Sequence, residues 1–67
     1  MKYRDLLDLL LRNGWTVDRT VGSHLQLRHR DRPGPVTLAA GGKLNRDVPP
    51  GTLGSVLKQA GLKGGTP

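Results

Sequence analysis

The stretch Ser23-His24-Leu25-Gln26-Leu27-Arg28-His29 alternates polar and apolar side chains, which predicts the β-strand on which the fold depends. Successive side chains of a strand point to opposite faces, so the two leucines of this stretch share one face. Gly22, immediately before it, predicts a tight connection to an earlier strand. We therefore expect a sheet with one apolar face and one open polar face, the latter carrying His24, Gln26 and Arg28.

Before this strand, the chain predicts a helix over residues 3–13 and a strand over residues 15–20. Gly14 is a typical residue for ending such a helix. In the strand, Trp15 and Val17 should face the apolar side. Since helical residues are 100° apart, the helix should present one apolar stripe, formed by Tyr3, Leu6, Leu7, Leu10 and Leu11.

After the central strand, the chain predicts a turn, a third strand, a loop and a second helix. The sequence Asp31-Arg32-Pro33-Gly34-Pro35 predicts the turn, and residues 36–39 the strand. Glycine, proline and charged side chains dominate residues 41–51, which indicates an exposed loop. The helix should begin after the N-cap Thr52 and end at Gly61. Its apolar residues fall within one arc, formed by Leu53, Val56, Leu57 and Ala60.

The predicted order is helix, strand, strand, strand, helix, which is an α+β fold with a three-stranded antiparallel sheet. Because one face of such a sheet is apolar, both helices should cover that face. The chain has 67 residues, which is enough for one domain with a modest core. We expect a single domain over residues 1–62 and a disordered tail over residues 63–67.

The composition favours an anionic partner. Eleven Lys and Arg residues stand against five acidic residues, for a formal net charge of +6. A basic domain attracts polyanions through counterion release, which makes nucleic acid the leading partner class; a basic surface kept for solubility is the alternative.

The chain has no cysteine, which excludes disulfides and suits the cytoplasm. No stretch approaches membrane-spanning length, so we expect a soluble cytoplasmic protein that does not bind membranes.

The two histidines are the candidates for acid–base chemistry near neutral pH. An odd separation places His24 and His29 on opposite strand faces, about 16 Å apart along the strand. We therefore expect no shared metal ion, no histidine pair and no cofactor. Ser23 cannot complete a nucleophilic triad, because strand neighbours diverge and no orienting acid is evident. A lone histidine can still cleave RNA, which supplies its own 2′-hydroxyl nucleophile; an ordinary surface histidine is the alternative.

Several motifs, taken together and in order, resemble the HicA toxin family. They are Gly22-Ser23-His24, then Pro50-Gly51-Thr52-Leu53 leading into the run from Ser55 to Leu62, together with the Leu-rich first helix and the step Asn13-Gly14-Trp15. The resemblance implies a fold like the double-stranded RNA-binding domain. It also implies the toxin of a type II toxin–antitoxin pair, a metal-independent endoribonuclease that cleaves mRNA and inhibits translation. The family's catalytic histidine corresponds to His24.

The resemblance further implies an mRNA substrate and a HicB-type antitoxin, with the toxin monomeric when free and hetero-oligomeric with the antitoxin. Members of the family often carry a histidine or a proline-histidine step where this chain has Ala39-Ala40-Gly41-Gly42. If that histidine protonates the leaving oxygen in other members, this chain must use Lys43, water or no donor instead. A non-catalytic RNA-binding module and a purely protein-binding domain are the alternatives. Candidate RNA contacts are Gly22, Ser23, Gln26, Arg28, Lys43 and Lys58.

Overall fold

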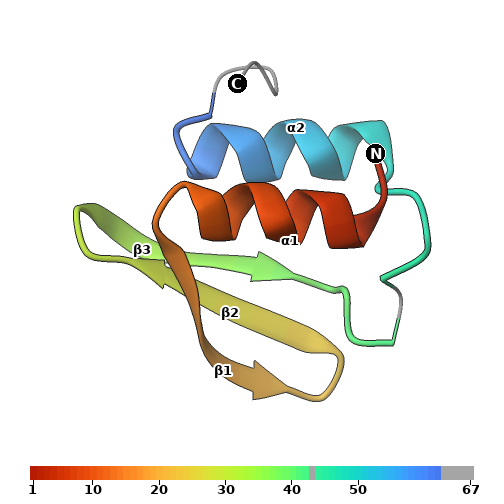
Figure 1. Cartoon of the computed structure of the whole chain (residues 1–67), viewed down its shortest axis with the longest axis horizontal. Helices are drawn as coiled ribbons and strands as arrows, with labels where there is room; N and C mark the ends of the chain where they lie inside the picture. The colour runs from red at the N-terminus through yellow and green to blue at the C-terminus, as the bar shows by residue number, and fades with distance from the viewer. Residues whose placement is uncertain (43, 63–67) are drawn as a thin grey trace.

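The computed structural model describes residues 1–42 and 44–62, and over these residues the chain folds into two helices and a three-stranded antiparallel sheet (Figure 1). Strand β2 lies between β1 and β3. This confirms the predicted order and the fold like the double-stranded RNA-binding domain. Lys43 and the expected tail, residues 63–67, lie outside the described residues. In chain order the elements are α1 (Tyr3–Arg12), β1 (Trp15–Val21), β2 (His24–His29), β3 (Arg32–Leu38) and α2 (Pro50–Gln59).

The hydrophobic core lies between the sheet and the helices α1 and α2. Leu27 of β2 is fully buried, as expected, and its partners across the sheet are Val17 and Val36. Since paired residues share a face, the face that carries Leu27 is the covered one. Both helices contribute to the same cluster, so both lie on this face. The buried residues are Tyr3, Leu6, Leu10, Trp15, Leu27, Val36, Leu38, Ala40, Val48, Val56, Leu57 and Ala60.

Backbone hydrogen bonds hold the ends of both helices. At the start of α1, the N–H groups of Tyr3 and Arg4 donate to carbonyl oxygens of the loop after β3, at 2.9 and 3.0 Å. At the end of α2, the Leu62 N–H donates to the Leu57 carbonyl at 2.7 Å, while Gly61 takes a positive φ of 73°. This 6→1 bond and left-handed glycine form a Schellman motif. The predicted helix end at Gly61 is confirmed, and Leu62 packs back against the core.

The turn between β2 and β3 lies at residues 30–31, so its prediction at Pro33-Gly34 is wrong. His29 pairs with Arg32 and Leu27 pairs with Val36, which leaves residues 33–35 opposite a single residue of β2. These residues form an irregular, bulged part of β3. Proline cannot donate a ladder hydrogen bond, but an edge strand does not need every donor, which explains why prolines occur within β3.

Other predictions also require correction. Helix α2 begins at Pro50, not after Thr52, because a proline at the first helical position has its φ preset for the helix. Val17 is 43% exposed and Leu11 is 46% exposed, although both were expected to face the core. Val17 lies on the edge strand β1, which runs away from both helices after its start (Figure 1). Leu11 lies at the margin of the apolar stripe of α1. Val48 is buried, within a loop predicted to be exposed.

Candidate functional site

The face of the sheet opposite the helices, here called the open face, carries mostly polar side chains. Strand pairing identifies its members, because residues paired across a sheet share a face. His24 pairs with Val21, Gln26 pairs with Arg19 and with Thr37, and Arg28 pairs with Thr16. All of these side chains are exposed except Gln26, which is half-buried. The residues expected on this face from their alternation, namely His24, Gln26 and Arg28, therefore lie there together.

His24 is the first residue of β2 and follows a two-residue hairpin turn. Gly22 occupies the first central position of this turn with a φ of 58°, the arrangement typical of a type II′ turn. Val21 and His24 pair directly across it. The imidazole is exposed, and among the described residues it makes no hydrogen bond or ion pair. Its ring nitrogens are therefore free to exchange protons with a bound molecule.

The segment after β3 lies against this hairpin turn. The Gly41 N–H donates a 2.8 Å hydrogen bond to the Ser23 carbonyl oxygen. Leu38, the last residue of β3, pairs with Leu25, the residue that follows His24. The turn that precedes His24 is thus held by β1 on one side and by the chain around Gly41 on the other.

A carboxylate and two guanidinium groups form an ion-paired cluster on the open face. The Arg28 Nε lies 3.1 Å from an Asp18 oxygen, and the Arg19 Nε lies 4.0 Å from the same oxygen. Their side chains are well exposed, so these pairs contribute at most about 1 kcal/mol each and can be exchanged for a phosphate contact. The cluster provides two cations on the face that carries His24.

Arg19 is a further candidate site residue, which strand parity alone does not predict. In a regular strand, the parity of Trp15 and Val17 would place Arg19 on the covered face as well. The register shifts between Val17 and Arg19, so Asp18 is an extra residue and every later side chain of β1 changes face. The bulge therefore brings Arg19 opposite Gln26, on the open face. The local sequence does not predict a bulge at this position.

One of the candidate RNA contacts, Lys58, does not lie beside His24. Lys58 is exposed in the last turn of α2, within the helix layer. Ala60 and Leu62, which follow it, lie near His29 at the opposite end of β2. The structure therefore does not bring Lys58 together with His24. Lys43 lies outside the described residues.

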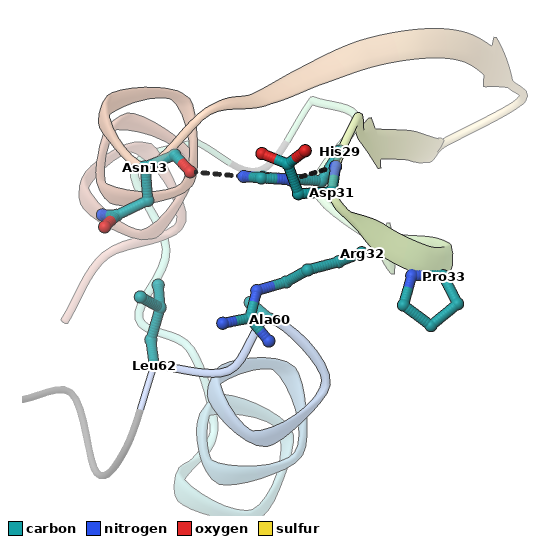
Figure 2. A pocket seen from close by; sticks show the side chains of 7 residues that line it. All are labelled: Asn13, His29, Asp31, Arg32, Pro33, Ala60 and Leu62. Carbon is teal, nitrogen blue, oxygen red and sulfur yellow. Dashed lines mark hydrogen bonds between the residues drawn. The ribbon is translucent and has the colours of Figure 1, made fainter.

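His29 occupies a second polar region, at the far end of β2 (Figure 2). Its Nε2 lies 2.9 Å from the Asn13 carbonyl oxygen, and its Nδ1 accepts a 3.0 Å hydrogen bond from the Asp31 N–H. A carbonyl can only accept and a backbone N–H can only donate, so both hydrogen bonds form in the tautomer with its proton on Nε2. The ring also packs against Trp15, with centroids 5.2 Å apart. As expected, His29 lies at the strand end near the turn.

The His29 ring borders a depression of about 480 Å³ between the ends of α1 and α2 and the β2–β3 turn. The Arg32 side chain reaches across it to the backbone at Gly61, where an added Cβ would collide with the guanidinium group. Both ring nitrogens of His29 are already engaged by backbone groups. In this region the end of α1, the β2–β3 turn and the end of α2 meet. The depression is lined by Asn13, His29, Asp31, Arg32, Pro33, Ala60 and Leu62.

Two further structural observations concern the described part of the chain. There, no three His, Cys, Asp or Glu side chains are grouped closely enough to share a metal ion. Neither α1 nor α2, the helices found in residues 1–42 and 44–62, is long and apolar enough to cross a membrane.

A comparison with protein-family models identifies one family. The model described as the HicA toxin of bacterial toxin–antitoxin systems matches residues 3–62, which span every element from α1 to the end of α2. A search of curated proteins finds no match. The chain therefore belongs to the HicA toxin family, so it is the toxin of a bacterial toxin–antitoxin pair and has an antitoxin as its partner.

Proposed function

We propose that this toxin is a metal-independent endoribonuclease that cleaves mRNA and thereby inhibits translation, with His24 as its catalytic residue. The observation that carries the proposal is the exposed His24 imidazole, which has no partner among the described residues and lies on the same face as Gln26, Arg19 and Arg28. A free imidazole beside phosphate-binding cations is a sufficient set of groups for RNA cleavage, since the substrate supplies the nucleophile.

In the proposed reaction, His24 removes the proton from a ribose 2′-hydroxyl. The 2′-oxygen forms a bond to the neighbouring phosphorus, and the bond from phosphorus to the 5′-oxygen of the next nucleotide breaks. The products are a 2′,3′-cyclic phosphate and a free 5′-hydroxyl, whose proton comes from water. Arg19 and Arg28 hold phosphates on the open face and stabilise the charge that develops in the transition state.

Other groups on or beside the open face complete the proposed RNA contacts. The backbone at Gly22 and Ser23 would contact the same RNA as His24. The Gln26 side-chain amide would form hydrogen bonds with a base or a ribose of that RNA. The net charge of +6 favours association with RNA generally. Lys43 and Lys58 remain candidate contacts, with Lys58 meeting an RNA that extends to the helix layer. We also propose that residues 1–62 form a single domain.

We further propose that the antitoxin is of the HicB type. The toxin is then monomeric when free, forms a hetero-oligomer with the antitoxin, and acts in the cytoplasm, where its mRNA substrate occurs. An acidic antitoxin surface would be drawn to a toxin of charge +6.

The test is the variant His24→Ala, with Thr37→Ala as its matched control because Thr37 is exposed on the same face. We expect His24→Ala to lower the cleavage rate of purified protein in EDTA by about 10²- to 10⁴-fold, and to abolish growth arrest on induction. Its melting temperature should not change, since the imidazole is exposed. Thr37→Ala should cleave RNA at the wild-type rate.

Undiminished cleavage by His24→Ala in EDTA would contradict the role of His24, and loss of wild-type cleavage in EDTA would contradict metal independence. If the wild-type protein binds RNA with a steep salt dependence but never shortens it, the protein is an RNA-binding module of the same fold. Absence of RNA affinity at low salt would identify a protein-binding domain.

A further inference from the structure

Gly41 makes an unusually close backbone approach to the turn that carries His24. Its N–H donates to the Ser23 carbonyl oxygen at 2.8 Å. A Cβ placed on Gly41 would lie 2.6 Å from the Ser23 Cα and 3.0 Å from its carbonyl carbon and oxygen. Real Cβ atoms do not approach backbone atoms this closely, so a side chain at position 41 must displace Ser23 or Gly41 itself.

The segment that contains Gly41 is anchored on both sides. Before it, Ala40 is fully buried in the core. After it, backbone hydrogen bonds join the loop to the start of the chain: the Tyr3 N–H donates to the Arg46 carbonyl at 2.9 Å and the Val48 N–H donates to the Met1 carbonyl at 2.8 Å. The core and the start of α1 thus hold the chain on either side of Gly41, so that Gly41 supports the Ser23 turn.

The backbone conformation of Gly41 does not by itself require glycine. Its φ lies outside the left-handed region that five other glycines adopt among the described residues. An alanine at this position is therefore opposed by its contact with Ser23 and not by its backbone conformation. Gly51 and Gly54 also lack a positive φ, but an added Cβ there would meet no atom of the described residues within 4 Å. They are matched controls for the same substitution without the contact.

We propose that Gly41 is a positioning residue for His24: its close packing and hydrogen bond fix the Ser23 turn, and the turn fixes where the imidazole meets the scissile phosphate. This role rests on the proposed ribonuclease function.

The experiment compares Gly41→Ala with Gly51→Ala and Gly54→Ala, using purified protein and one RNA substrate. We expect Gly41→Ala to lower kcat by about 100-fold, because displacing a catalytic group by about 1 Å has an effect of this size. KM should change less than about threefold, since Arg19 and Arg28 are retained. The control variants should keep the wild-type kcat. In ¹H–¹⁵N spectra, Gly41→Ala should shift the amide signals of Ser23, His24 and Leu25 while those of Leu57 and Ala60 stay in place.

A double variant separates positioning from a general structural effect. If Gly41 acts through His24, adding Gly41→Ala to His24→Ala should not lower the residual rate further. A folded Gly41→Ala protein with wild-type kcat, or with an additive effect in the double variant, would overturn the proposal. Rapid hydrogen exchange of the wild-type Gly41 amide would also overturn it, and this measurement needs no variant.

Failure of the proposed ribonuclease function gives a different result. In that case the wild-type protein and His24→Ala are equally inactive or equally active, whereas the shifts at Ser23 and His24 in the Gly41→Ala spectrum still report whether the turn has moved. Unmoved signals with normal folding would overturn the positioning role irrespective of catalysis.

Discussion

His24 and His29 begin and end the same strand, yet their side chains have opposite surroundings. The His24 imidazole is exposed on the open face and has no partner among the described residues. The His29 imidazole lies on the covered face, packs against Trp15 and binds backbone groups through both ring nitrogens. An odd separation along a strand is sufficient to produce this difference. The partners of a histidine, more than its presence in a motif, therefore indicate whether it can transfer protons to a ligand.

The largest difference expected between the two histidines concerns the stability of the fold. His29→Ala should lower the free energy of unfolding by about 1–3 kcal/mol, because the Asp31 N–H loses its acceptor and the Trp15 ring loses a packing partner. The folded fraction should keep the wild-type kcat. His24→Ala should change the free energy of unfolding by less than about 0.5 kcal/mol, as is usual for an exposed side chain.

Urea denaturation of both variants at one pH, together with single-turnover cleavage below the unfolding transition, measures the two quantities. If His29→Ala is as stable as the wild type, the His29 hydrogen bonds do not join the elements as described. A fully folded His29→Ala protein without activity would give both histidines a part in catalysis.

A smaller effect concerns the cations on the face of His24. Arg19→Gln should reduce the slope of log K against log[salt] for single-stranded RNA by about 0.7, the contribution of one phosphate contact. Arg12→Gln is the matched control, because it removes the same charge from an exposed, ion-paired arginine of α1. We expect the control to leave the slope unchanged. Equal reductions of the slope in both variants would mean that RNA binding depends on the net charge of the protein and not on the open face.

The smallest effect is spectroscopic and concerns the ring protons. Long-range ¹H–¹⁵N spectra of neutral His29 should show the tautomer with its proton on Nε2, because Nδ1 accepts from the Asp31 N–H. The His29 ring N–H should exchange slowly with water and the His24 ring N–H rapidly. Finding the His29 proton on Nδ1 would remove the basis for contrasting the two rings.

Much of this architecture is predictable from short-range pattern. The alternation over β2 correctly assigned the faces of His24, Leu27 and Arg28, and the 3.6-residue period correctly assigned the buried face of α1 apart from Leu11. Gly61 correctly marked the end of α2. These predictions succeed because each depends on the direction of a side chain within a single element.

The errors share a different cause. The Pro33-Gly34 dipeptide is a strong turn signal, but the register between His29 and Arg32 placed the turn earlier and made the prolines part of an edge strand. Trp15 and Val17 share a face, yet only Trp15 is buried, because β1 runs away from both helices after its start (Figure 1). Such outcomes depend on which element lies above or beside a residue, and local sequence does not contain that information.

By itself, the sequence determined the order of the elements, the basic charge, the separation of the two histidines by strand parity and the resemblance to the HicA toxins. Tertiary structure alone decided which residues from other strands and loops accompany His24. The bulge at Asp18 moved Arg19 onto the open face, and the chain after β3 placed Gly41 against Ser23. The physical reason is that periodicity sets the direction of a side chain within its own strand, whereas register shifts and backbone contacts between distant segments arise only when the sheet and its loops pack together.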